Sequence, residues 1–220
     1  DGLHINQDSK GLNDDYDVGH HHSMISMTDA IRILGLAKYT PGMIIQYITD
    51  LCSEDGTISE VTLHQGIIQL IRKHYMSLPL MERPLADHIL QRLFIVFQIG
   101  STGVVTFTDI ASALLVFCGG SMERKAKCAF SLFSQKIGIS HEGICSVLTA
   151  IFKIVSDLDP GHHFNSATSC TDIASELSSD IFAQFPQYAN HSTGVSLLPV
   201  DIFSSIFAKI LNKFDASLVD

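Results

Sequence analysis

The chain has 220 residues, of which 46% are hydrophobic and 17% are charged, and its formal net charge is -9. This length suits one large domain or two small lobes with a proper core, and the low charged fraction predicts an apolar surface in places. Because a strongly acidic chain repels phosphate backbones, the charge excludes nucleic acid as an expected partner.

The N-terminal part of the chain is polar, rich in Asp, Gly, Asn and His, and without periodicity. This composition predicts a flexible leader over residues 1–24. Because the chain begins at Asp1 and not at Met, we expect a fragment or a processed form of a longer protein.

Regular helical spacing of apolar residues begins after this leader and continues along the chain. A cap at Ser26 or Thr28 and the pair Thr40-Pro41 predict two helix starts. Ser121 and Ser140 predict two more. The expected helices thus begin at about residue 28 and at Pro41 and then cover about 63–71, 85–97, 108–117, 122–133, 141–155, 172–185 and 199–213. A linker is expected over residues 157–171.

A helix–loop–helix unit with a glycine in the loop recurs along the chain. The glycines are Gly56, Gly103, Gly138 and Gly194, and a β-branched residue follows each within two places. Four such units form two pairs, because a lone unit leaves its loop unpaired. We expect the apolar residue two places after each glycine to pair with the partner loop.

Residues 93–110 and the turn at 113–125 resemble the second hand and the inter-lobe turn of the neuronal calcium sensor and recoverin group of EF-hand proteins. Residues 47–52, 129–133 and 181–185 resemble entries to the first, third and fourth hands. The resemblance implies an all-α fold of two EF-hand-like lobes, with short β-bridges between paired loops. The expected N-terminal pair covers residues 25–119, and the C-terminal pair covers residues 120–220.

The second loop, residues 98–109, has few calcium ligands. Placing its turn glycine at position six puts Gln98 at position one, Thr102 at five, Val104 at seven and Asp109 at twelve. Calcium requires six to eight oxygens, usually with carboxylates at positions one, three and five and a glutamate at twelve. One carboxylate remains here, so this loop is interpreted as a vestigial or weak site.

The other loops are also depleted. The first loop has Leu51 at position one, Ser53 at three and Asp55 at five, again with one carboxylate. The third is about two residues short, and the fourth has Pro186 where the first ligand is expected. We therefore expect no bound metal beyond a vestigial or weak calcium site, and no cofactor. No G-x-S-x-G, phosphate-binding or H-E-x-x-H motif is present, so we do not expect an enzyme.

Five cysteines without a CxxC pair suit reduced thiols in a cytoplasmic protein. No run of about eighteen apolar residues predicts a membrane span, and membrane association stays open. The basic cluster Arg72-Lys73-His74 is interpreted as a solvated helix face.

The expected function is a calcium-independent protein-interaction module that binds an amphipathic helix, from a partner or from its own polypeptide, in an apolar groove. The chain's own tail, residues 205–218, is one candidate for filling that groove. Two alternatives remain: a calcium sensor with one unconventional site at residues 98–109, and a regulatory domain of a larger multidomain enzyme. The predicted groove residues are Ile44, Tyr47, Ile48, Ile67, Leu90, Phe94, Phe97, Leu114, Phe117, Phe130, Phe133, Phe152, Phe182 and Phe207.

Overall fold

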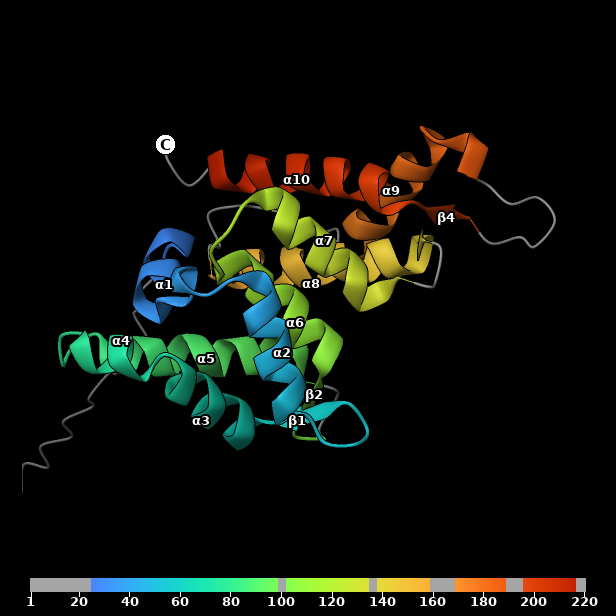
Figure 1. The fold of residues 1–220 in the computed structure, drawn as a ribbon. Helices are drawn as coiled ribbons and strands as arrows, with labels where there is room; N and C mark the ends of the chain where they lie inside the picture. The colour runs from blue at the N-terminus through green and yellow to red at the C-terminus, as the bar shows by residue number, and fades with distance from the viewer. Residues whose placement is uncertain (1–24, 99–101, 135–137, 159–168, 189–195, 217–220) are drawn as a thin grey trace, which may run out of the picture.

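The computed structural model describes residues 25–98, 102–134, 138–158, 169–188 and 196–216, with side chains as far as Asn212. Helices make up most of this structure, and two short strand pairs join the loops (Figure 1). The predicted all-α class is confirmed. The predicted leader 1–24, the loop glycine Gly194 and most of the predicted linker 157–171 lie outside the described residues.

The first half contains two units, and in each of them a short strand lies between two helices. Its elements are α1 (Met27–Leu34), the 3-10 helix η1 (Leu36–Lys38), α2 (Pro41–Leu51), β1 (Thr57–Ser59), α3 (Glu60–Leu70), α4 (Arg72–Ser77), α5 (Arg83–Phe97), β2 (Val104–Thr106) and α6 (Phe107–Phe117).

The described second half repeats the order from α2 to α6, without counterparts of α1, η1 and α4 and with a 3-10 helix before its second strand. Its elements are α7 (Met122–Phe133), β3 (Ile139–Ser140), α8 (His141–Leu158), α9 (Cys170–Ala183), the 3-10 helix η2 (Pro186–Tyr188), β4 (Leu197–Leu198) and α10 (Val200–Ala216).

Side-chain caps determine where several helices begin. The Thr40 side chain accepts from the Met43 amide ahead of α2, where proline occupies the first turn. Ser121 accepts from the Arg124 amide ahead of α7. Each cap satisfies a backbone amide that lacks a partner in the first helical turn. Both predicted starts are confirmed.

The helices of each half pair in the same way. In the first half α2 packs against α6 and α3 against α5. In the second half α7 packs against α10 and α8 against α9. In both halves the outer two of these four helices contact each other, and so do the inner two. The strand pairs β1–β2 and β3–β4 join the two units of each half.

The strand registers test the predicted pairing of the loops. Ile58 pairs with Val105 in the antiparallel pair β1–β2, so the apolar residue two places after the glycine is the paired one in the first half. In the second half Ile139 pairs with Leu198, although Ile139 follows Gly138 directly. The two-place rule is therefore wrong for β3 and β4, because Ile139 comes one place after Gly138 and Leu198 comes four places after Gly194.

One hydrophobic cluster contains residues from both halves. Helix α8 packs against α5 and α6, and α7 packs against α2 and α6. An ion pair adds to this contact: Arg92 Nε of α5 donates to Asp157 Oδ2 of α8 at 3.0 Å. The predicted boundary at 119/120 falls in the turn between α6 and α7, but the halves share a core across it.

Most of the residues predicted to line a groove lie in the core of this structure. Ten of the fourteen are buried, because α1 and α8 cover the apolar faces of α5 and α6 and the rest lie in the shared core. Their exposed fractions run from 0% for Ile44 to 5% for Phe97. The four half-buried members are Tyr47, Phe130, Phe133 and Phe182. The ten buried residues are Ile44, Ile48, Ile67, Leu90, Phe94, Phe97, Leu114, Phe117, Phe152 and Phe207.

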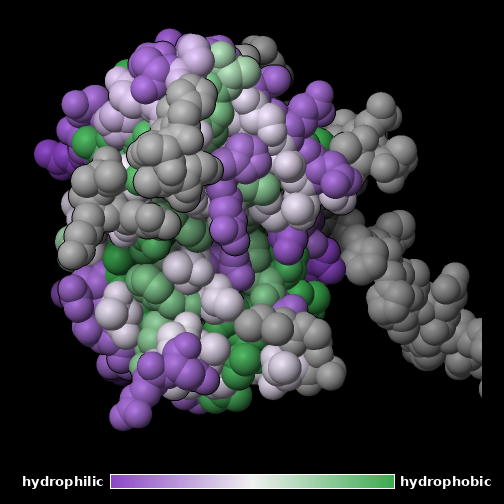
Figure 2. Space-filling view, turned by 90° about the vertical axis from the view of Figure 1, so that its right-hand side faces the viewer, coloured by the Kyte–Doolittle hydropathy of each residue, from purple (hydrophilic) through white to green (hydrophobic). Residues whose placement is uncertain are grey.

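Some apolar surface remains outside this core. On the side that faces right in Figure 1, hydrophobic residues gather in the central and lower part of the surface and alternate with hydrophilic ones (Figure 2). The surface is therefore mixed on this side, as the low charged fraction of the chain predicts.

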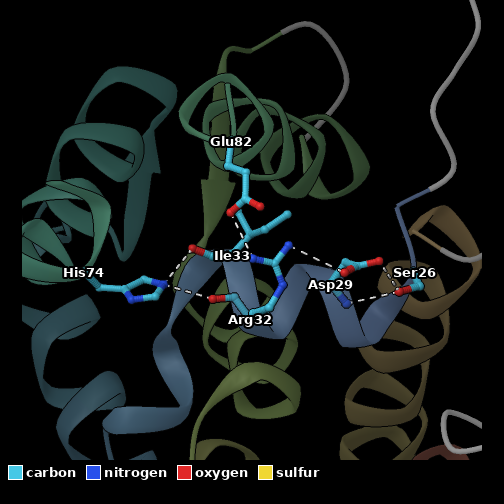
Figure 3. A network of polar contacts seen from close by, with 6 residues as sticks. All are labelled: Ser26, Asp29, Arg32, Ile33, His74 and Glu82. Carbon is cyan, nitrogen blue, oxygen red and sulfur yellow. Dashed lines mark hydrogen bonds and ion pairs between the residues drawn. The ribbon is translucent and has the colours of Figure 1, made fainter. Parts of the chain in front are cut away.

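A polar network holds α1 against α4 and α5 (Figure 3). Ser26 caps the helix and bonds Asp29, and Arg32 Nη1 donates to Glu82 at 2.9 Å. His74 Nε2 lies 2.9 Å from the carbonyl oxygen of Arg32 and 3.1 Å from that of Ile33. Because carbonyl oxygens only accept, Nε2 is the protonated nitrogen. His74 thereby satisfies carbonyls at the C-terminal end of α1.

Candidate functional site: the paired loops and the exposed apolar surface

The first loop closes on itself through the side chains of Ser53, Asp55 and Thr57. Thr57 donates to Asp55 Oδ1 from its hydroxyl at 2.7 Å and from its amide at 3.0 Å. The Ser53 hydroxyl lies 2.5 Å from the same oxygen and 2.7 Å from the Thr57 carbonyl oxygen. The Ser53 amide also donates to that carbonyl, at 3.0 Å.

These contacts use two of the atoms that a cation would need, Asp55 Oδ1 and the Thr57 carbonyl oxygen. In a calcium loop the carboxylate at position five and the carbonyl at position seven are both ligands. Here Asp55 and the Thr57 carbonyl hold these positions, and both accept hydrogen bonds from within the loop. The bonds from Ser53 and then Thr57 lower the pKa of the Asp55 carboxyl. The loop is therefore internally satisfied without an ion.

The carboxylate of the second loop serves as part of a helix cap. Thr106 precedes α6, and its side chain accepts from the Asp109 amide at 3.1 Å. Its hydroxyl donates to Asp109 Oδ2 at 2.7 Å. Asp109 also lines a cavity of about 380 Å³ with residues of α8 and α9, among them His141 and Glu142. Its carboxylate is thus committed to the start of α6.

The other predicted members of the second loop lie at different depths. Gln98 follows the end of α5 and is half-buried, Thr102 is exposed, and Val104 begins β2. The residues between Gln98 and Thr102 are outside the described part of the chain. The described ligand candidates of this loop therefore include a single carboxylate.

The strand register renumbers the remaining loops. If Ile139 and Leu198 take the position of Ile58, the third loop has Gly143 at position twelve and the fourth has Ile202 there. The third loop is then full length, which corrects the sequence prediction of a shortened loop. Pro186 begins η2, outside the fourth loop, so its predicted place at position one is also wrong.

A hydroxyl cap recurs at the start of the helix after the loop. Ser59 accepts from the Thr62 amide at 3.2 Å, and Ser140 accepts from the Gly143 amide at 3.1 Å, as Thr106 does in the second unit. In these three loops the backbone amide of the residue at position twelve donates to the capping hydroxyl. None of these residues is glutamate, the bidentate ligand of calcium loops. Among the described residues, no group of three or more His, Cys, Asp or Glu side chains could hold a metal ion.

Six large hydrophobic side chains in the described structure are more than half exposed. Three of them, Met76, Leu80 and Met81, come from the end of α4 and the turn into α5, and they are 59%, 77% and 81% exposed. The others are Met43, Val61 and Ile95. Single exposed apolar residues are normal, but a local group is typical of a binding surface. The sequence prediction does not include this group, because it places the groove on the apolar faces of helices, whereas Leu80 and Met81 lie in a turn.

The cysteines carry no disulfide, and Cys118 is buried at the end of α6. Burial raises the pKa of the Cys118 thiol to about 11, although the nearby Lys125 ammonium opposes the shift. A thiol in this state is a poor nucleophile at neutral pH.

No family model matches the chain, and no curated protein matches it. None of the helices in the described residues is long and apolar enough to cross a membrane.

Proposed function

We propose that this chain is a calcium-independent, EF-hand-like protein-interaction module that binds an amphipathic helix of a partner protein. The observation that carries the proposal is the first loop, where Asp55 and the Thr57 carbonyl already accept hydrogen bonds from Ser53 and Thr57. A cation would have to compete with these bonds for Asp55 Oδ1 and the Thr57 carbonyl oxygen.

The arrangement of the helices supports the EF-hand-like part of the proposal. Four helix–strand–helix units form two pairs, each joined by a short antiparallel bridge. The bridge residues Ile58 and Val105 follow the turn glycines Gly56 and Gly103, whose φ angles are 75° and 71°. Such positive φ values favour glycine, as the sharp turn of an EF-hand loop requires.

The surface open to a partner is the exposed apolar group and not the buried aromatic residues. Met76, Leu80 and Met81 are more than half exposed, whereas Phe94 and Phe117 are already covered. Removing exposed apolar area from water is the main driving force of helix docking. The module thus acts by binding and not by catalysis. Its five unpaired thiols favour a reducing, cytoplasmic environment.

Calorimetry and thermal melting with calcium and with magnesium test the calcium independence. We expect no heat of binding and an unchanged melting temperature at millimolar calcium. A rise of several degrees would overturn the proposal, because a ligand that binds the folded state stabilises it.

A matched variant shows whether the assay can detect a working loop. The triple substitution Leu51→Asp, Ser53→Asp and Thr62→Glu adds acids at positions one, three and twelve of the first loop and removes the Ser53 hydroxyl bonds. We expect this variant to gain a calcium response, since carboxylates supply both ligands and compensating charge.

A further inference from the structure

A surface cavity of about 540 Å³ lies along α3 and α4. The helix axis changes at the buried Ile71, whose φ and ψ of -90° and 13° interrupt the run between the two helices. The face formed in this way combines apolar, polar and basic side chains. The cavity is lined by His64, Gln65, Ile68, Gln69, Arg72, Tyr75 and Met76.

Contacts with α5 hold one side of this cavity in place. The Tyr75 hydroxyl donates to Asp87 Oδ2 at 3.1 Å, and His64 Nε2 lies 3.1 Å from Asp87 Oδ1. The Arg83 guanidinium lies 5.9 Å from the centre of the Tyr75 ring. These contacts fix two lining residues before any partner binds, and a preformed site loses less entropy on binding.

The exposed apolar group adjoins the cavity. Met76 belongs to both, and Arg83 Nη2 donates to the Met76 carbonyl at 2.9 Å, which brings the start of α5 against the end of α4. Leu80 and Met81 lie in the turn between these two residues. Methionine side chains adapt to many partner shapes, so this surface suits a helix with an apolar face.

The charge of the surface differs from that of the whole chain. The net charge of the chain is -9, yet the exposed Arg72 lines the cavity, the exposed Lys73 follows it in α4, and Arg83 lies over the ring of the lining residue Tyr75. Asp87, which contacts Tyr75 and His64, adds one negative charge against these three cations, and the nearby Glu82 is paired with Arg32. The local charge is therefore positive, and the complementary partner is acidic.

We propose that the surface formed by the cavity and the residues Met76, Leu80 and Met81 docks an acidic amphipathic helix of a partner protein. This inference rests on the proposed function and names the surface and the partner chemistry. The helix would lay its apolar face over Ile68 and Met76 and pair its carboxylates with Arg72 and Lys73. An anionic membrane is disfavoured, because the flat surface of a bilayer does not fill a hollowed site.

The test uses the full chain and two fluorescent synthetic helices. Both carry leucine at the i, i+3, i+4 and i+7 positions; one carries glutamate and the other lysine at the flanking positions. We expect the acidic helix to bind at least about tenfold more tightly than the basic one and to weaken as salt rises. The Arg72→Glu variant should lose about tenfold in affinity for the acidic helix.

A matched control carries the same charge change elsewhere. Arg124 is exposed in the first turn of α7, so Arg124→Glu should leave the affinity for the acidic helix unchanged. Met81→Asp should weaken binding without unfolding the chain, because Met81 is 81% exposed. Circular dichroism of each variant checks that the fold is retained.

Each other outcome contradicts a defined part of the reasoning. Equal binding of both helices, or no effect of Arg72→Glu, overturns the surface. If an NMR titration with the acidic helix changes chemical shifts only in α7 and α10, the surface is overturned but the interaction module still stands. Binding of the acidic helix only with calcium overturns the proposed function and leaves the surface standing. Self-association abolished by Met81→Asp, or binding to anionic vesicles abolished by Arg72→Glu, assigns the surface to another occupant and overturns the inference.

Discussion

Gly35 ends α1 in a conformation that leaves no room for a side chain, and Gly35→Ala is therefore expected to destabilise the fold. Its φ is 62°, in the left-handed region, and an added Cβ would lie 2.2 Å from His74 Cδ2. The left-handed conformation costs alanine about 1–2 kcal/mol. Moving the ring also removes the bonds from His74 Nε2 to the α1 carbonyls, worth about 1 kcal/mol net.

The expected loss in the free energy of unfolding is about 2–3 kcal/mol, which lowers the melting temperature by about 4–12 °C for a domain of this size. Urea denaturation followed by circular dichroism measures the change. Gly42→Ala in α2 is the matched control, since nothing lies within 4 Å of its added Cβ and alanine favours a helix.

The His74→Ala background separates the two contributions. With the ring removed, Gly35→Ala should cost only the conformational part, about 1–2 kcal/mol. A Gly35→Ala variant within about 0.5 kcal/mol of the wild type would refute the packing of His74 over the end of α1.

Three further variants or measurements test other contacts. Arg92→Ala should lower the free energy of unfolding by about 1–3 kcal/mol, because it leaves Asp157, whose side chain is 13% exposed, without its ion pair; no change in urea denaturation would contradict this. Cys118, with a thiol pKa of about 11, should resist alkylation at pH 8 in the native protein and react in urea, as mass spectrometry can measure; rapid native labelling would contradict its burial. The lowered pKa of Asp55 stabilises the fold above its ordinary value of 3.8 and ceases to do so as the pH falls through the lowered value. The stability advantage of the wild type over Asp55→Asn should therefore shrink between pH 5 and pH 2, and an advantage independent of pH would argue against the loop bonds.

Features that depend on neighbouring residues were predictable from the sequence. The caps at Thr40 and Ser121 act within one helical turn, and the pair Ile58–Val105 follows from two turn glycines at equal distance. The second strand pair was not predictable by the same rule, because Gly138 precedes Ile139 directly. Equal spacing between glycine and strand holds in one pair of loops only.

Features that depend on distant segments could not be predicted from periodicity. The pattern of α5 indicates an apolar face with Leu90 and Phe94, but it does not say which helix covers that face; α1 and α8 do so. The basic cluster Arg72-Lys73-His74 was interpreted as a solvated face. Its first two residues are exposed, but His74 turns toward α1 and bonds its carbonyls. The sequence alone does not show that His74 points toward another helix while Arg72 and Lys73 point into solvent.

The position of α8 determines how the chain should come apart. This helix pairs with α9 in its own half and packs against α5 and α6 of the other half, so neither half can lose its structure without uncovering the other. Cutting the chain in the turn after Gly120 should therefore leave two fragments that aggregate or reassociate. The intact chain should melt in one transition seen alike by circular dichroism and by calorimetry. What repeats along the sequence as four units would then behave as a single unit of folding.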